Sequence, residues 1–267
     1  MRKSCNRLND SPKHHVAMFS GGAGSWAAAK RIPKKTGRLT LLFADSLIED
    51  EDLYRFIDEA AADVGGLLVK VAEGRDPWQV FFDKRFLGNS RVDPCSRILK
   101  RELLRDWLDS NCDPADTTIY LGFDWTEAHR FERAQGYWEP WEVRAPLCDP
   151  PYIDKAQVLS ELRAADIEPP RLYGMGFPHN NCGGFCIKQG MAGFRRLLEV
   201  FPARYDYHER KEQEIREFLG KDVAILRDRT GGTSTPLTLR SLREQIEAGA
   251  ESEQLKLDWG GCGCFSP

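Results

Sequence analysis

The chain has 267 residues, of which 41% are hydrophobic and 10% aromatic, so it can bury a substantial core in one large or two small domains. Lysine and arginine number 38 against 41 aspartate and glutamate, and the net charge of -3 excludes a globally basic nucleic-acid-binding surface. No apolar run approaches the roughly 20 residues of a membrane helix, and residues 1–15 lack the apolar core of a signal peptide. We therefore expect a globular cytoplasmic protein without membrane contacts.

The first predicted unit is a strand, a glycine loop and a helix. An apolar strand over residues 16–19 is followed by Ser-Gly-Gly-Ala-Gly-Ser, and a helix begins near Trp26. Glycine exposes backbone N–H groups, and a helix N-terminus adds unpaired donors and a partial positive charge, so this segment predicts a phosphate site. It matches neither a Walker loop nor a dinucleotide fingerprint. The candidate nucleotide-binding residues are Ser20, Gly21, Gly22, Ala23, Gly24 and Ser25.

The next elements predict an α/β fold. Residues 39–44 form a buried strand, residues 52–64 an amphipathic helix, and residues 67–71 a third strand. This alternation is typical of a parallel sheet with right-handed crossovers. Asp45 follows the second strand, at the edge where open α/β sheets bind nucleotides, and it either contacts the nucleotide or caps the next helix.

Charged and thiol groups follow in the middle of the chain. A helix is predicted over residues 94–108 with Asp93 as its cap, which places Cys95 in the first turn, where a thiol pKa is lowered. A fourth strand over residues 118–123 leads to Glu127 and Arg130. Their three-residue spacing also fits an ordinary ion pair on a helix surface.

The C-terminal half predicts a helical subdomain and a cysteine site. We expect a nucleotide-binding domain over residues 14–150 and a helical subdomain over residues 151–267 packed on it. Eight cysteines are many for a reducing compartment, which favours metal binding or thiol chemistry over disulfides. Four thiolates suit zinc or a 4Fe-4S cluster, and Cys95 could replace one of them or act as the reactive thiol. The two glycine-flanked pairs that form the predicted metal site are Cys182 with Cys186 and Cys262 with Cys264.

Several of these motifs together resemble the PP-loop ATP pyrophosphatases and phosphoadenylyl sulfate (PAPS) reductases, which share the adenine nucleotide alpha-hydrolase fold. Residues 20–25 resemble the PP-loop S-G-G-x-D-S, with Gly24 in place of the usual aspartate. Residues 95–100 resemble a C-x-x-x-x-K segment of PAPS reductases and of DNA phosphorothioation sulfurtransferases. Residues 122–130 resemble a G-x-x-x-x-E-x-x-R segment of the same family.

The resemblance implies a parallel-sheet, Rossmann-like (HUP) core that binds ATP, or PAPS or its unphosphorylated relative APS, together with Mg²⁺. By resemblance, Cys95 and Lys100 belong to the catalytic site. Glu127 would hold a metal ion or water, and Arg130 would hold the phosphate or the sulfur-bearing group. Related enzymes carry iron–sulfur clusters, so the resemblance favours a 4Fe-4S cluster over zinc.

The expected activity is that of a PP-loop enzyme acting at the α-phosphate of an adenylyl nucleotide to support sulfur transfer. The acceptor would be a nucleic acid or a sulfur-carrier protein. One alternative is a PAPS or APS reductase with a cysteine nucleophile, since the segment from Cys262 to Cys264 resembles the mobile tail of those enzymes. A second alternative is a non-catalytic nucleotide-binding module.

Overall fold

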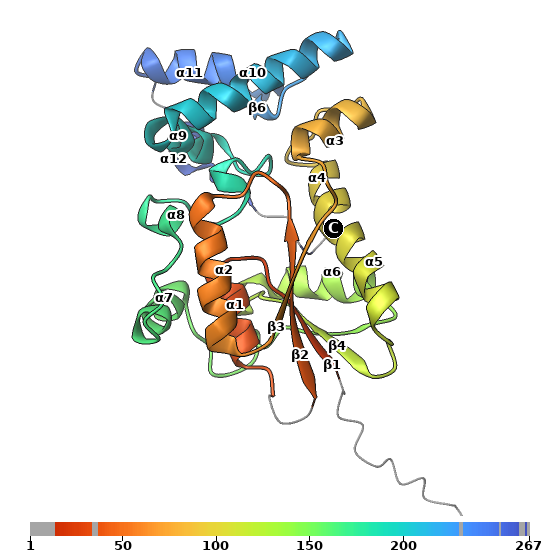
Figure 1. Ribbon diagram of the computed structural model, residues 1–267. Coiled ribbons are helices and arrows are strands. Elements are labelled where there is room, and N and C mark those ends of the chain that lie inside the picture. The colour runs from red at the N-terminus through yellow and green to blue at the C-terminus, as the bar shows by residue number, and fades with distance from the viewer. Residues whose placement is uncertain (1–13, 34–36, 230–231, 251, 262–264, 266–267) are drawn as a thin grey trace, which may run out of the picture.

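The computed structural model describes residues 14–33, 37–229, 232–250, 252–261 and 265 (Figure 1). Its centre is a five-stranded sheet in the order β3-β2-β1-β4-β5, in which every neighbouring pair is parallel. The predicted parallel α/β architecture is therefore confirmed. The strands are β1 (His14–Met18), β2 (Arg38–Asp45), β3 (Leu67–Ala72), β4 (Thr117–Tyr120) and β5 (Glu142–Arg144).

The predicted phosphate loop lies at the switch point of the sheet. β1 pairs with β2 on one side and with β4 on the other. The chain moves from β1 toward β3 on one side and later returns to add β4 and β5 on the other. Crossovers that diverge in this way leave a crevice at the carboxyl end of the central strand, which is where residues 20–25 begin.

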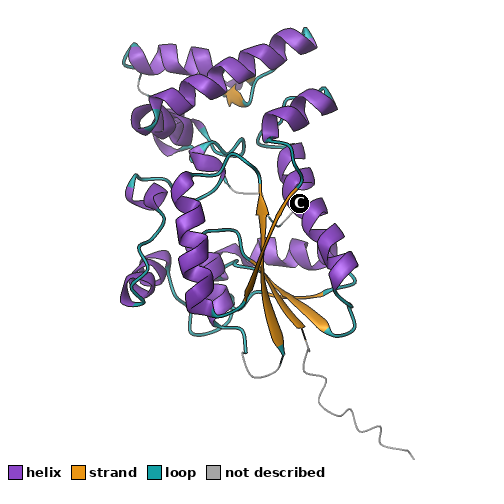
Figure 2. Cartoon of the chain, in the orientation of Figure 1, coloured by secondary structure: helices purple, strands orange, loops and turns teal. Residues whose placement is uncertain are grey.

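Helices cover both faces of the sheet (Figure 2). One buried cluster joins β1 and β2 to α1, α2 and α7, and another joins the opposite face to α5 and α6. The helices of these two layers are α1 (Ala23–Lys30), α2 (Glu51–Val64), α7 (Lys155–Ala164), α5 (Leu103–Asn111) and α6 (Ala128–Trp138).

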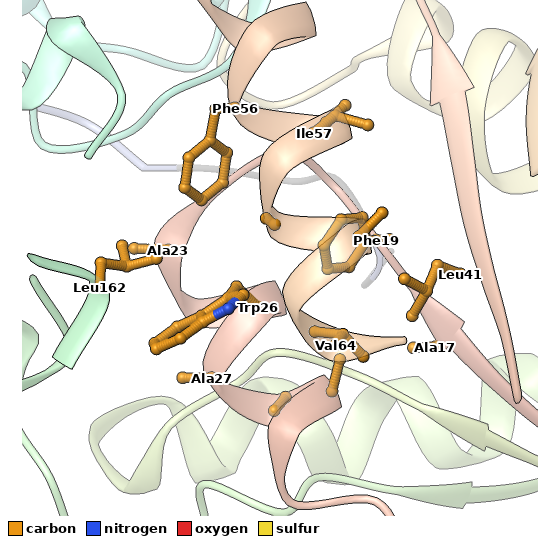
Figure 3. Close-up of a cluster of buried hydrophobic side chains, with 14 of the residues drawn as sticks. Ala17, Phe19, Ala23, Trp26, Ala27, Leu41, Phe56, Ile57, Val64 and Leu162 are labelled. Atoms are coloured by element: carbon orange, nitrogen blue, oxygen red, sulfur yellow. The ribbon is translucent and has the colours of Figure 1, made fainter. Parts of the chain in front are cut away.

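Helix α2 shows how the sequence builds this core. Its N-cap Asp50 accepts the Asp52 N–H, and Gly65 ends it in the left-handed conformation with φ of 77°. Its apolar face, which includes Phe56 and Ile57, packs toward Trp26 of α1 (Figure 3). Each such large side chain contributes roughly 1.5–3 kcal/mol when fully buried, so this face fixes α1 and the loop before it.

The segment after α3 (Pro77–Lys84) differs from the predicted single helix over residues 94–108. It consists of a short α4 (Pro94–Ser96), a π-helical segment η1 (Arg97–Glu102) and then α5. Asp93 is the N-cap residue of α4, as we expected, but its side chain makes no cap hydrogen bond and pairs with Arg101 at 3.4 Å and Lys188 at 3.6 Å. Lys188 is far from Asp93 in the sequence, so no local pattern could show that contact.

The C-terminal helices lie together beyond the carboxyl ends of the strands (Figure 1). They share a third buried cluster with α3. Helix α7 belongs to the predicted C-terminal subdomain, yet it packs on α1 of the predicted nucleotide-binding domain. The boundary between residues 150 and 151 therefore stays a prediction. None of the helices in the described ranges is long and apolar enough to cross a membrane. The remaining elements are η2 (Trp125–Glu127), α8 (Arg171–Gly174), η3 (Cys182–Gly184), α9 (Met191–Val200), α10 (Pro202–Leu219), β6 (Leu226–Asp228), β7 (Thr235–Leu237), α11 (Leu239–Glu247) and α12 (Glu253–Leu257).

Candidate functional site

A cavity of about 350 Å³ opens where the predicted phosphate loop meets the end of β4. Five of the six predicted loop residues line it, together with Glu127 and Arg130. The opposite wall comes from the start of α7, from α8 and from the segment before Cys182. The loop residues in the lining are Ser20, Gly22, Ala23, Gly24 and Ser25, and those of the opposite wall include Lys155, Tyr173, His179, Asn180 and Asn181.

The loop is held in shape by its own backbone and by the C-terminal half of the chain. Gly21 has φ of 76°, and a Cβ there would lie 2.9 Å from Leu53 Cγ, so this position requires glycine. Its carbonyl accepts the side-chain amide of the buried Asn180 at 2.8 Å. Ser25 Oγ donates to the Gly22 carbonyl at 2.7 Å, so this hydroxyl stabilises the loop.

Close packing explains the glycine that replaces the usual PP-loop aspartate. A Cβ on Gly24 would lie 3.1 Å from the Gly122 carbonyl oxygen, and a Cβ on Gly122 would lie 2.9 Å from Ser25 Cα. The start of α1 and the end of β4 therefore meet backbone to backbone. A side chain at either position would require the two segments to move apart, so the departure from the family motif has a steric cause.

The cavity carries two cationic side chains suited to an anionic ligand. Arg130 forms an ion pair with Glu127, and both side chains line the cavity. The pair can therefore be an ion pair on a helix and part of the ligand site at the same time. The Lys155 ammonium donates to the Pro178 carbonyl and lies 4.1 Å from the centre of the Tyr173 ring. Burial of this ammonium lowers the pKa of Lys155 to about 8, although the side chain as a whole is exposed.

Two further groups complete the wall of the cavity. Burial, with Lys155 nearby, lowers the pKa of His179 to about 4, so its imidazole is neutral at pH 7. The Tyr173 hydroxyl accepts the Ala23 N–H at 3.2 Å, at one of the loop donors. No local sequence pattern marks Lys155, Tyr173, His179 or Asn180 as site residues, because they reach the loop across at least 130 residues of chain.

Asp45 and Lys100 are not among the described residues that line this cavity. The Asp45 carboxylate accepts the Tyr54 hydroxyl at 3.0 Å and the Leu47 N–H at 2.8 Å, and the cap of α2 is Asp50. A nucleotide contact by Asp45 stays a prediction. Lys100 lies instead beside the cysteines, where its ammonium pairs with Glu49 at 3.0 Å.

Three cysteines meet at a second, smaller cavity of about 20 Å³. Cys95, Cys182 and Cys186 line it, and Asn181 lines both this cavity and the larger one. The expected direction for Cys95 is wrong, because burial raises the pKa of its thiol above the usual value. The pKa of Cys182 is also raised, first by a hydrogen bond with Cys186 and then by burial. Desolvation of the thiolate outweighs the effect of the three-residue helix α4.

The tail that carries the second cysteine pair passes close to both cavities. The Gly261 N–H donates to the Lys188 carbonyl at 3.0 Å, and a Cβ on Gly260 would lie 2.3 Å from the same oxygen. Phe265 lines the larger cavity, and its carbonyl accepts the indole N–H of Trp138 at 3.2 Å. Cys262 and Cys264 themselves lie outside the described residues.

The described cysteines alone do not make a metal site. No group of three His, Cys, Asp or Glu side chains within the described ranges is arranged to hold a metal ion. The smaller cavity has room for about one water-sized atom, which is far less than a 4Fe-4S cluster occupies. Because the predicted set includes Cys262 and Cys264, four-cysteine ligation stays a prediction.

The sequence matches no protein-family model and no curated protein. Among solved structures, it is similar to PAPS reductase from Candida auris in a phosphate complex (16% identity, TM-score 0.43, 66% of this chain and 88% of that chain). It is also similar to NMN synthetase from Francisella tularensis (15%, 0.45, 94% and 90%). A third match is the U34-tRNA thiolase NcsA from Methanococcus maripaludis with its [4Fe-4S] cluster (12%, 0.34, 87% and 80%). Similarity this low leaves the reaction to be argued from the site.

Replacing Gly22 with valine should abolish ATP binding while the fold is retained. Gly22 has extended backbone angles (φ -100°, ψ 155°) that a β-branched residue adopts readily. Its Cβ would lie 3.3 Å from the Tyr173 hydroxyl, on the side of the loop where phosphate is expected. Isothermal titration calorimetry measures the affinity, and thermal unfolding checks the fold. Gly136→Val is a matched control, because a Cβ at Gly136 meets nothing within 4 Å; unchanged ATP affinity in Gly22→Val refutes the phosphate site.

ATP affinity should fall as the pH rises through about 8, because Lys155 then loses the charge that attracts phosphate. Burial lowers the pKa of Lys155, and the negative charge of Glu127 raises it. Lys155→Met should weaken ATP binding roughly 10- to 100-fold at pH 7, the usual effect of losing a hydrogen bond to a charged group. Lys155→Arg should bind ATP without the pH step, since arginine keeps its charge. Calorimetry from pH 6.5 to 9.5 (roughly 1.5 units either side of 8) measures both, and a step that persists in Lys155→Arg would assign it to another group.

Proposed function

We propose that this chain is an enzyme that binds ATP or a related adenylyl nucleotide and acts at its α-phosphate to support sulfur transfer. The phosphates would lie on residues 20–25, with Arg130 and Lys155 opposite. One observation carries the proposal: Asn181 lines both the cavity of the phosphate loop and the cavity of the three cysteines. An anion site and a group of thiols therefore share one wall, which sulfur chemistry on an activated nucleotide requires.

The proposed reaction has two displacements. An acceptor oxygen bonds to the α-phosphorus while the bond to the pyrophosphate breaks, and the loop N–H groups with Arg130 and Lys155 stabilise the leaving charge. Sulfur supplied as hydrosulfide then bonds to the activated carbon, the carbon–oxygen bond breaks, and AMP leaves without net oxidation or reduction.

Glu127 and Asp124 line the cavity, and Mg²⁺ is often held by one or two carboxylates plus phosphate oxygens. Bound there, Mg²⁺ would neutralise phosphate charge.

A PAPS or APS reductase is the second candidate, and the position of Phe265 favours it. This residue follows Cys264 directly in the sequence and lines the larger cavity. In that reaction a cysteine thiolate bonds to the sulfate sulfur, the sulfur–oxygen bond to the nucleotide breaks, and a second thiol releases sulfite as a disulfide forms. A non-catalytic nucleotide-binding module is the remaining alternative.

Assays with labelled nucleotides separate these three activities. Sulfur transfer predicts pyrophosphate release from ATP that depends on an acceptor, and it predicts loss of that release in Gly22→Val. Reduction predicts sulfite release from PAPS or APS instead. Binding of ATP without either product would contradict both enzymatic proposals and support the non-catalytic module.

We also propose that Cys182, Cys186, Cys262 and Cys264 bind a metal centre, a 4Fe-4S cluster ahead of zinc, with Cys95 nearby. The contact of Gly261 with Lys188 supports this proposal, since it brings the start of the tail next to the segment that follows Cys186. Anaerobic purification with iron, acid-labile sulfide and zinc analysis should find one of these centres. The double variant Cys262→Ser/Cys264→Ser should lose it, whereas Cys112→Ser, beside His14 and far from the tail in sequence, should not. Metal-free protein, or an unchanged metal content in the double variant, contradicts the proposal.

A further inference from the structure

Two exposed aromatic side chains lie on segments whose neighbouring residues line the larger cavity, and they have no part in the reaction described above. Trp125 is 48% exposed and Tyr152 is 58% exposed, and their ring centroids lie 6.1 Å apart. Trp125 lies between Asp124 and Thr126, which both line the cavity, and Tyr152 directly precedes Ile153, which also lines it. The two rings therefore form one aromatic surface at the rim of the proposed active site.

The segments that carry these rings are fixed before any ligand binds. The Trp125 indole N–H donates to the Ile153 carbonyl at 3.3 Å, which ties one segment to the other. The Asp124 carboxylate accepts the Thr126 N–H at 2.8 Å and caps the turn.

Tyr152 lies on a loop that is anchored to α1. The Arg31 guanidinium donates to the carbonyls of Pro146, Asp149 and Pro151, at 2.9, 3.1 and 2.7 Å. A rigid aromatic surface loses little conformational entropy when a ligand stacks on it, so this surface is preorganised for binding.

The chemistry of this surface favours a planar ring over a charged chain. Stacking of a base on an aromatic side chain contributes roughly 1–3 kcal/mol. The segments that carry the two rings contain Asp149 and Asp154 as well as His129 and Lys155, so acidic and basic residues are mixed in them. Such a rim does not attract a phosphate backbone strongly, whereas it leaves the ring faces accessible. Trp138 and Trp141, which lie between these two residues in the sequence, are buried instead.

We propose that Trp125 and Tyr152 form the acceptor subsite, on which a planar heteroaromatic ring stacks at the mouth of the nucleotide cavity. The inference rests on the proposed function, since it names the kind of acceptor that the same site takes. A ring with a carbonyl oxygen would supply the oxygen that is activated at the α-phosphate. Free nucleosides and unpaired bases of a nucleic acid share this chemistry. Trp125 and Tyr152 are positioning residues in this proposal.

The test compares two affinities in aromatic variants of the full chain. The variants are Trp125→Ala and Tyr152→Ala, with Trp125→Phe and Tyr152→Phe as conservative versions that keep a ring. Phe218→Ala is the matched control, because Phe218 is 45% exposed and lies on α10. Calorimetry measures the affinity for ATP, and then, with a non-hydrolysable ATP analogue bound, the affinity for the ring probes. The probes are the common ribonucleosides and short single-stranded RNAs of a single base.

The alanine variants should bind the ring probes roughly 5- to 100-fold more weakly, the loss expected for one stacked ring, with ATP affinity unchanged. Tyr152→Phe and Phe218→Ala should resemble the wild type, and Trp125→Phe, which keeps a ring but loses the indole N–H, should bind the probes more tightly than Trp125→Ala. Tighter binding of the RNAs than of the nucleosides would assign the ring to a nucleic acid, and the reverse to a small molecule. The proposal is overturned if no probe binds the wild type, or if the alanine variants bind the probes normally.

A loss of ATP affinity equal to the loss of probe affinity would also overturn it, because the rings would then hold the adenine of the nucleotide. Failure of the proposed function is a separate result. It would appear as absence of ATP binding to the wild type, whereas the ring probes can still be titrated without nucleotide. The two failures are therefore distinguishable in the same set of titrations.

Discussion

Two buried carboxylates after β2 hold the rest of the site in place. The Glu49 side chain is 1% exposed and accepts the Lys100 ammonium and the Cys182 N–H. Asp50, equally buried, caps α2 and pairs with two arginines from the C-terminal half, Arg171 at 2.7 Å and Arg204 at 3.1 Å. A buried charge that loses its partner typically costs about 3–5 kcal/mol, so the turn at Cys182 has one stable position on the sheet edge.

Fixing that turn also fixes the boundary between the two cavities. The residues before Cys182 run from the phosphate loop, where Asn180 donates to the Gly21 carbonyl, to the thiols, where Asn181 lines the common wall. A short segment thus couples the position of an anion site to that of three cysteines. The segments that carry Trp125 and Tyr152 are anchored separately, through the Ile153 carbonyl and through Arg31 at the end of α1.

The parts of this arrangement that the sequence predicted are local. The apolar runs predicted the strands along the chain, and the glycines of residues 20–25 predicted the position of the loop, because both follow from neighbouring residues. Lys155, Tyr173 and Asn180 could not be found in this way, since their contacts with the loop close over long stretches of chain. The π-helical segment after Asp93 was also missed. The roles of the catalytic and metal residues stay predictions.

The environment of the thiols limits what chemistry they can do in this state of the protein. Burial raises the pKa of Cys95 and Cys182, so the protonated thiol is favoured at each position. Lys100 lines the same cavity, but much of its charge is balanced by Glu49. A nucleophilic cysteine requires the thiolate. Reaction at these thiols therefore requires a change that stabilises negative charge there, either separation of the Glu49–Lys100 pair or arrival of a cation in the cavity, and both would act on the turn that borders the nucleotide.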